Sequence, residues 1–191
     1  MAYYTAAALR ARVTDLADAD AYTDTMLEDW ISEFETLAER YCGVAFTSRS
    51  ATEYHTLRGD YEVPLRWPEI ASITSASVAY GTSTTTLTVT DLTILRPIPA
   101  VDLGSSYTGT LTIVYAHGYA TTPKGIMRAC REFVRIKAQQ EASGTTRDYL
   151  YDPTGARVST ADWDKGRPTG YLDVDDALNA AKYGGRWLGV A

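Results

Sequence analysis

The central segment, residues 44–121, is the part of the sequence that most constrains the fold. It is rich in Thr, Ser, Val, Ile and Tyr, residues that favour extended structure. Apolar and polar residues alternate over residues 110–115, and Gly and Pro interrupt the runs before them. The connections between the runs are too short to hold the helices of βαβ units. We therefore expect a module of four to six antiparallel strands.

Amphipathic helices are predicted on both sides of this module, over residues 24–42 and 123–142. In the first helix, Thr25 and Glu28 have the spacing of a capping box, and Gly43 suits the end. Its apolar stripe comprises Leu27, Trp30, Ile31, Phe34, Leu37, Ala38 and Tyr41. The second helix begins with Thr122 and Pro123, and its apolar face comprises Ile126, Cys130, Phe133, Val134 and the stem of Lys137. A shorter helix is expected over residues 5–14.

The C-terminal segment, residues 145–191, is polar and contains several Gly and Pro residues with scattered aromatic residues. A short helix is expected over residues 173–183, with Asp173 as its cap. Such a segment is either a disordered terminus or a tail that folds onto a partner. Aromatic, arginine and large apolar side chains would anchor the second kind of tail, and the candidates are Tyr171, Leu178, Arg186, Trp187 and Leu188.

These patterns together predict an α+β fold. We expect a helical core, made of two long amphipathic helices and short terminal helices, with an inserted antiparallel β module and an extended C-terminal tail. The expected domains are a core of residues 1–144 and a tail of residues 145–191.

Charge is distributed unevenly along the chain. Residues 1–42 hold nine acidic and three basic residues, which equals the formal net charge of the whole chain, −6. In the second helix, Lys124, Arg128, Arg131 and Arg135 recur at steps of four, three and four and form one basic stripe. This stripe is either a solvated face, a contact with DNA phosphates, or a contact with the acidic helix of a neighbouring subunit. In the inter-subunit interpretation, the residues expected at the contact are Glu28, Glu35, Glu39, Arg128, Arg131 and Arg135.

Motifs for catalysis, metals or cofactors are not found in the sequence. The two histidines, His55 and His117, lack the spacing of metal ligands, and no phosphate-binding glycine loop occurs. The aspartates at 173, 175 and 176 lack a calcium-binding loop and suit the first turn of a helix. Cys42 and Cys130 are expected to be buried free thiols, although a disulfide between them is the alternative. No apolar run is long enough to span a membrane. The prediction is a protein that is not an enzyme and has no cofactor.

Three short sequence motifs occur in an order that is similar to that of a known protein family. A helix ends in Tyr41, Gly43 and Phe46, and the strand segment 63–70 reads Val-Pro-Leu-Arg-Trp-Pro-Glu-Ile. Residues 112–119, Thr-Ile-Val-Tyr-Ala-His-Gly-Tyr, then precede the Thr122-Pro123 helix start. This arrangement resembles the head-to-tail connector (adaptor, or head completion) family of long-tailed bacteriophages. Residues 168–179 are similar to the tails of adaptors from phages of actinobacteria.

The resemblance implies a structural virion protein of the neck, made in the host cytoplasm. Such subunits form a ring of about twelve copies under the portal protein. The ring extends the DNA channel and takes part in virion assembly and DNA ejection. Its partners would be other copies of itself, the portal protein, and a stopper or tail-completion protein. Genomic double-stranded DNA would pass through the lumen without sequence-specific binding, and no membrane is involved.

Three other functions remain as alternatives. The chain could be another neck protein, either a head-tail stopper or a tail terminator. It could be a small enzyme or lytic factor, although no catalytic set is visible. A general DNA-binding module is disfavoured by the acidic balance.

Overall fold

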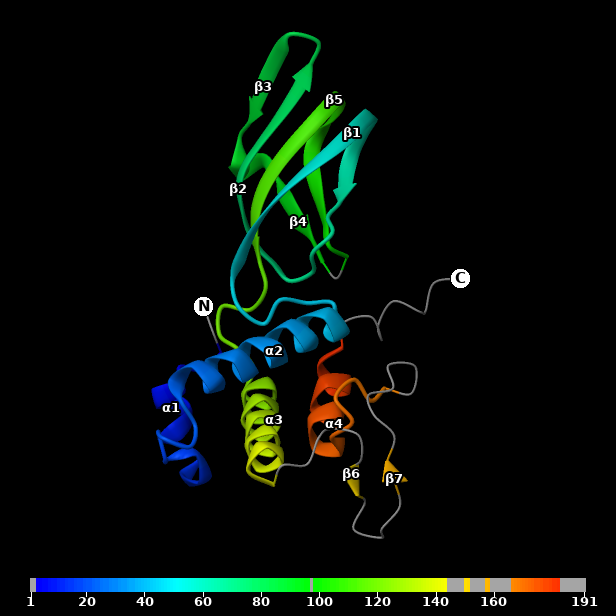
Figure 1. Ribbon diagram of the computed structural model, residues 1–191. Helices are drawn as coiled ribbons and strands as arrows, with labels where there is room; N and C mark the ends of the chain where they lie inside the picture. The colour runs from blue at the N-terminus through cyan, green and yellow to red at the C-terminus, as the bar shows by residue number, and fades with distance from the viewer. Residues whose placement is uncertain (1–2, 97, 144–149, 152–156, 159–165, 183–191) are drawn as a thin grey trace. The chain divides into compact units, whose positions relative to one another are not determined.

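The structure is a computed structural model that describes residues 3–96, 98–143, 150–151, 157–158 and 166–182. The chain divides into two compact units. The helical unit comprises Met1–Gly43 and Thr122–Ala191, and the β unit is Val44–Thr121. Figure 1 shows helices α1 to α4 in the helical unit and strands β1 to β5 in the β unit.

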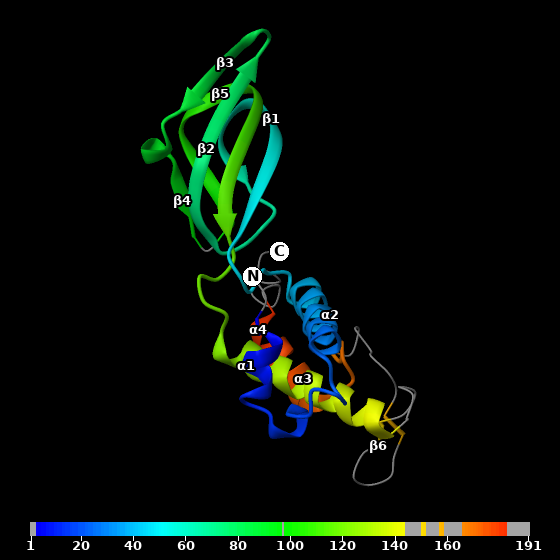
Figure 2. The same ribbon diagram turned by 60° about the vertical axis from the view of Figure 1, so that its left-hand side comes forward.

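The β unit is one antiparallel sheet with the strand order β1-β5-β2-β3, and β4 pairs with the beginning of β5. Strand β5 therefore lies between β1 and β2, as Figure 2 shows. The elements are β1 (Arg49–Pro64), β2 (Ile70–Tyr80), β3 (Ser83–Leu87), the 3-10 turn η2 (Val89–Asp91), β4 (Thr93–Leu95) and β5 (Ala100–His117).

Strands β1 and β5 have two consecutive register shifts, between Arg58 and Asp60 and between Asp60 and Glu62. Asp60 pairs with Tyr107, whereas Glu62 pairs with Asp102. Because β5 uses five residues where β1 uses two, the strands bend there. Buried residues on both sides of the bend form one hydrophobic core. Burying a Leu or Ile side chain contributes about 1.5–3 kcal/mol, so this core is a main source of stability for the β unit. It comprises Leu57, Val63, Leu65, Ile70, Ile73, Ala76, Val78, Leu87, Val101, Leu103, Leu111, Ile113 and Tyr115.

The other face of the sheet is exposed and carries hydroxyl side chains. On β1, Thr52, Tyr54 and Thr56 are exposed and alternate with the more buried Glu53 and His55. This alternation is the period-2 pattern of a strand that is buried on one face only.

The described residues of the helical unit form four α-helices, and the two longest are amphipathic. They are α1 (Ala6–Arg10), α2 (Asp24–Cys42), α3 (Lys124–Ser143) and α4 (Leu172–Ala181), with the 3-10 turn η1 (Thr14–Leu16) and a pairing of β6 (Leu150–Tyr151) with β7 (Arg157–Val158). The cap of α2 is Thr23, whose hydroxyl accepts a hydrogen bond from Met26 N at 3.3 Å, so the expected Thr25 cap is wrong. Gly43 ends α2 with a φ of 69°, in the left-handed region.

Aromatic side chains join α2 to α3 inside the helical unit. The ring centroids of Phe34 and Phe133 are 5.5 Å apart, and Tyr3 packs edge-on against Phe34 at 6.1 Å. Cys42 and Cys130 are buried free thiols, as expected. Burial raises the pKa of the Cys42 thiol to about 12, so it stays protonated and unreactive at neutral pH.

The C-terminal part of the chain is not simply an extended tail, contrary to the sequence-based expectation. Residues 166–182 fold onto the helical unit, where Tyr171, Val174 and Leu178 are buried. The Tyr171 hydroxyl donates to Gln140 Oε1 of α3 at 3.1 Å. Tyr41 of α2 hydrogen-bonds to Asn179 of α4. Helix α4 therefore belongs to the same packed unit as α2 and α3.

The expected helical core carrying an inserted β module is also wrong. The chain is α+β, but the sheet dominates, because β1 and β5 alone span 16 and 18 residues and the sheet has its own core. The physical reason is the bend in β1 and β5, which lets the apolar face of the sheet pack against itself. The expected division into residues 1–144 and 145–191 stays a prediction.

Candidate interaction surfaces

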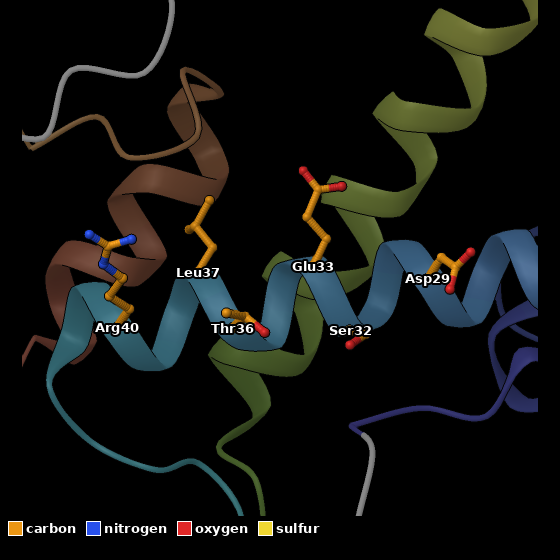
Figure 3. Close-up of a pocket in the computed structure, with 6 residues that line it drawn as sticks. All are labelled: Asp29, Ser32, Glu33, Thr36, Leu37 and Arg40. Atoms are coloured by element: carbon orange, nitrogen blue, oxygen red, sulfur yellow. The ribbon is translucent and has the colours of Figure 1, made fainter.

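One face of α2 lines a shallow groove on the helical unit. Figure 3 shows Glu33 and Leu37 projecting to the same side of α2. The groove combines carboxylates, hydroxyls, one apolar side chain and one cation, which is the composition of a polar contact surface rather than of a small-molecule pocket. Its lining residues are Asp29, Ser32, Glu33, Thr36, Leu37 and Arg40.

The acidic residues predicted to face a neighbouring subunit lie in two environments. Glu28 is exposed on the first turn and a half of α2. Glu35 accepts a hydrogen bond from the backbone N–H of Tyr3, and Glu39 accepts one from the Tyr3 hydroxyl at 3.5 Å. Glu35 and Glu39 thus hold the N-terminal segment against α2. Glu28 alone of the three keeps its side chain fully at the surface.

The basic residues of α3 divide in the same way. Arg128 is exposed, as is Lys124 at the first position of the helix. Arg135 Nε donates to Asp15 Oδ2 at 3.1 Å, and its guanidinium also pairs with Glu132 at 3.5 Å. Arg131 is half-buried, and its Nε has no hydrogen-bond partner among the described residues. The segment around Asp15 therefore engages one end of the basic stripe within the chain.

The predicted tail anchors also separate. Tyr171 and Leu178 are buried inside the helical unit, so their side chains contact a partner only if α4 leaves its place. Arg186, Trp187 and Leu188 lie outside the described residues. The predicted partner contacts of all five residues stay predictions.

Asp175 was assigned by the sequence to a first-turn carboxylate, and the structure gives it a specific role. It is 1% exposed and accepts hydrogen bonds from Thr169 N at 2.8 Å, Thr169 Oγ1 at 2.6 Å and Gly170 N at 3.1 Å. Burial raises the pKa of Asp175, and these hydrogen bonds oppose the shift. The carboxylate thereby fixes the turn that leads into α4. Tyr171, not Asp173, occupies the cap position, and no side chain caps the helix there.

A polar cluster around Glu53 in the β unit was missed by the sequence analysis. The Tyr115 hydroxyl and Arg66 N both donate to Glu53 Oε1, the latter at 3.0 Å, and His55 Nε2 lies 3.0 Å from Glu53 Oε2. Burial and the bond to Glu53 raise the pKa of Tyr115, which therefore remains a hydroxyl donor. The cluster ties the β1–β2 connection to the sheet. Its only signal in the sequence is a carboxylate at an inward position of the β1 alternation.

His117, the last residue of β5, lies next to Tyr115 of this cluster. Its ring stacks on Trp67 with centroids 5.0 Å apart and planes 8° from parallel. His117 is buried, and its Nδ1 has no hydrogen-bond partner among the described residues. Burial lowers the pKa of His117, Arg49 lowers it further, and Glu53 opposes both. The imidazole is therefore neutral at neutral pH and acts as a packing surface for Trp67.

No group of three or more His, Cys, Asp or Glu side chains is placed to hold a metal ion among the described residues. Across the same residues, no helix has the length and apolar character required to cross a bilayer.

Comparison with solved structures shows a shared fold. A chain from the neck of an empty GTA (gene transfer agent) particle, computed with C6 symmetry, is 17% identical with a TM-score of 0.56. The match covers 94% of this chain and 89% of that one. A chain from the neck of a native GTA particle, computed with C12 symmetry, is 16% identical with a TM-score of 0.51, over 78% of this chain and 85% of that one. No protein-family model matches the sequence, and no curated protein matches it.

Proposed function

We propose that this chain is a structural subunit of the head-to-tail neck of a phage-like particle. The observation that carries the proposal is the fold likeness to a neck chain, because it extends over 94% of this chain and so includes both units. A protein with this role resides in the virion. Its work is assembly and channel formation, so it needs binding surfaces and no catalytic site.

Within the neck, we assign the chain to the adaptor ring under the portal protein. A ring subunit needs two different, complementary sides. Exposed Glu28 on α2 and exposed Arg128 on α3 supply opposite charges for such sides. The C12 symmetry of the similar neck supports a ring of twelve copies. The far side of the ring would receive a stopper or tail-completion protein.

The net charge of −6 suits a channel through which DNA slides. Phosphates are held by lysine and arginine side chains, and each such contact adds to the salt-dependent affinity for DNA. Arg135 already pairs with Asp15, and Lys137 pairs with Glu33, so these cations are partly neutralised within the chain. We infer that DNA passes the ring without sequence-specific binding.

Portal docking is assigned to the C-terminal residues Arg186, Trp187 and Leu188. The fold determines where this assignment should be tested. Because Tyr171 and Leu178 are buried against the helical unit, removing residues 145–191 would also remove part of that unit. Deleting residues 183–191 spares α4 and is the sharper experiment. We expect the shortened chain to keep its thermal unfolding temperature and to lose portal binding. Retained portal binding would contradict the docking assignment.

The experiment that tests the function is native mass spectrometry of the purified protein, alone and mixed with the portal protein of its particle. An adaptor adds to the portal ring in about twelve copies, even if it is monomeric alone. A stopper instead ignores the portal and binds only when an adaptor ring is already present. A chain that joins neither assembly would overturn the neck proposal.

A further inference from the structure

Strand β3 is an edge of the sheet, and within the part of the chain that the structure describes only β2 pairs with it. Proteins usually blunt such edges with charged residues, proline, a bulge or a covering segment, because the unpaired N–H and C=O groups would otherwise accept another strand. Residues 83–87 read Ser-Thr-Thr-Thr-Leu, without charge or proline. Their pairing with β2 runs without a register shift from Ala76↔Leu87 to Tyr80↔Ser83. Ser83 to Thr86 are exposed.

The hairpin register shows which β3 groups point outward. Tyr80 and Ser83 flank a two-residue turn, and Gly81 at its first position has a φ of 60°. Residues that flank such a turn exchange both hydrogen bonds, and hydrogen-bonded and non-bonded pairs then alternate along the ladder. The backbone N–H and C=O groups of Ser83, Thr85 and Leu87 therefore face β2. The N–H and C=O of Thr84 and Thr86 point away from the sheet.

The same alternation extends across the sheet to the other edge, β1. Pairing of β2 with β5 is regular from Ser75 to Ala79, and pairing of β1 with β5 is regular from Arg49 to Arg58. Counting the alternation through both ladders leaves five β1 residues with their N–H and C=O directed outward. One of them, Arg58, is charged and already donates its backbone N–H to Asp60 Oδ2 at 2.8 Å. The other four are uncharged and carry a hydroxyl, and Tyr54 is 71% exposed. They are Ser50, Thr52, Tyr54 and Thr56.

The two edges complement each other in direction and in face. The four strands β1, β5, β2 and β3 alternate in direction, so β3 runs opposite to β1. A second copy in the same orientation would therefore bring an antiparallel β1 to β3. Thr84 and Thr86 lie on the same exposed face as Thr52 and Tyr54, so pairing would join like faces of the two sheets.

We propose that β3 of one subunit pairs with β1 of a second copy, so that the sheet continues from subunit to subunit. The inference rests on the proposed neck function, because it is the ring that requires a repeated contact. Pairing of β3 with β3 would use the same patch twice and would stop at a dimer. Pairing of β3 with β1 is head-to-tail, which is the kind of contact that closes into a ring such as the C12-symmetric neck of similar fold.

Proline substitutions at the outward positions test the pairing. Proline at Thr84 and Thr86 removes only N–H groups that face solvent, so the β2–β3 ladder is retained. We expect Thr84→Pro/Thr86→Pro to weaken assembly at least about tenfold, measured by native mass spectrometry and sedimentation. The matched control, Thr84→Val/Thr86→Val, keeps both N–H groups and should assemble like the wild type. Assembly of the proline variant at wild-type strength would overturn the proposal.

A mixture of two blocked variants distinguishes head-to-tail pairing from pairing of like edges. Thr52→Pro blocks the β1 edge and leaves the β3 edge intact. Thr84→Pro/Thr86→Pro blocks the β3 edge and leaves the β1 edge intact. Each variant alone should be monomeric, and an equal mixture should stop at dimers. Assembly of Thr52→Pro alone into dimers through β3 would overturn the head-to-tail arrangement.

Hydrogen exchange of wild-type amides covers the case in which a proline variant does not fold. In the full-length protein with portal, the amides of Thr84 and Thr86 should exchange about tenfold more slowly than in the dilute chain, while that of Thr85 is protected in both. A portal-bound ring in which Thr84 and Thr86 exchange at the dilute rate would keep the neck function and overturn the edge pairing. If protection of Thr84 and Thr86 rises with protein concentration but the chain never enters a portal ring, the edge pairing stands and the neck function is overturned. A chain that never associates would overturn both.

Discussion

Lys137 Nζ lies 2.6 Å from Glu33 Oε2, and this ion pair joins α3 to α2 within one chain. The Lys137 side chain is only 14% exposed, and its ammonium lies 5.3 Å from the ring centroid of Phe133. One interpretation of the basic stripe was that it meets the acidic helix of a neighbouring subunit, and here an ion pair joins the two helices within one chain. The pair helps to fix how α2 and α3 are arranged within the chain.

We expect Glu33→Gln to lower the free energy of unfolding by about 1–2 kcal/mol, because the partly desolvated Lys137 ammonium loses its carboxylate. Urea unfolding at pH 7 measures the change. Asp29→Asn is the matched control, since Asp29 is an exposed carboxylate one turn earlier on α2, and its effect should stay within about 0.5 kcal/mol. Equal effects of the two substitutions would contradict a structural role for the pair.

The sequence predicts the helical faces well and the long-range contacts poorly. Helical spacing identified Leu27, Ile31 and Phe34, and all three are buried. It also placed the stem of Lys137 on the apolar face of α3, which is why the ammonium reaches α2. The partner carboxylate on α2 was not identifiable, because spacing within one helix carries no information about which turn of another helix lies opposite.

The C-terminal segment and the Glu53 cluster show more clearly that sequence patterns do not predict long-range contacts. Tyr171 and Leu178 stand in a polar stretch, so composition suggested anchors for a partner, whereas both pack against helices that lie far away in the sequence. Glu53 and Tyr115 are separated by 62 residues, and only the register of β1 against β5 brings them together. A local pattern predicts which way a side chain faces, but not what it meets there.

Two glycines provide a contrast in backbone requirements. Gly109 has a φ of 129°, and a Cβ there would lie 2.2 Å from the carbonyl oxygen of Ala79. We expect Gly109→Ala to destabilise the β unit by about 2–4 kcal/mol. Gly125 in α3 has open space around it, so Gly125→Ala should stabilise the protein by about 0.5–1 kcal/mol. Urea unfolding curves of the two variants should therefore move in opposite directions, and movement in the same direction would contradict this account.

His117 should make the stability of the β unit depend on pH. Its pKa is lowered in the folded state, so below its ordinary value of 6.5 the unfolded chain takes up a proton more readily than the folded chain. Stability is therefore full above pH 6.5 and is lost as pH falls through the lower folded pKa. His117→Phe keeps a ring against Trp67 and removes this dependence. Thermal unfolding of both proteins between pH 7.5 and about pH 5 measures the difference, and parallel curves would contradict the assignment.

Asp175 should make the stability of the helical unit depend on pH. Asp175→Asn replaces an oxygen with an amide donor at Thr169 or Gly170 N–H, and we expect a loss of about 1–3 kcal/mol. Because the folded pKa of Asp175 is raised, its contribution is largest below the ordinary aspartate pKa and falls as pH rises through the folded value. The stability advantage of the wild type over the variant should therefore shrink from acidic to neutral pH. Urea titrations at several pH values test this, and an advantage that grows toward neutral pH would contradict it.

Glu28 and Arg128 belong to the charged set predicted to lie between subunits, and both are exposed. Arg135 of the same set is exposed too, but it pairs with Asp15, so Glu28 and Arg128 give the cleaner test of that prediction. We expect Arg128→Glu to weaken ring assembly with portal by about threefold to tenfold, because a rim charge contributes a modest free energy. Adding Glu28→Arg should restore assembly if the two side chains face each other across the interface. Arg135→Glu is the control, since Arg135 already pairs with Asp15 within the chain and its reversal should lower stability more than assembly. Undiminished assembly of Arg128→Glu would remove these charges from the interface and leave the sheet edges as the contact that remains to be tested.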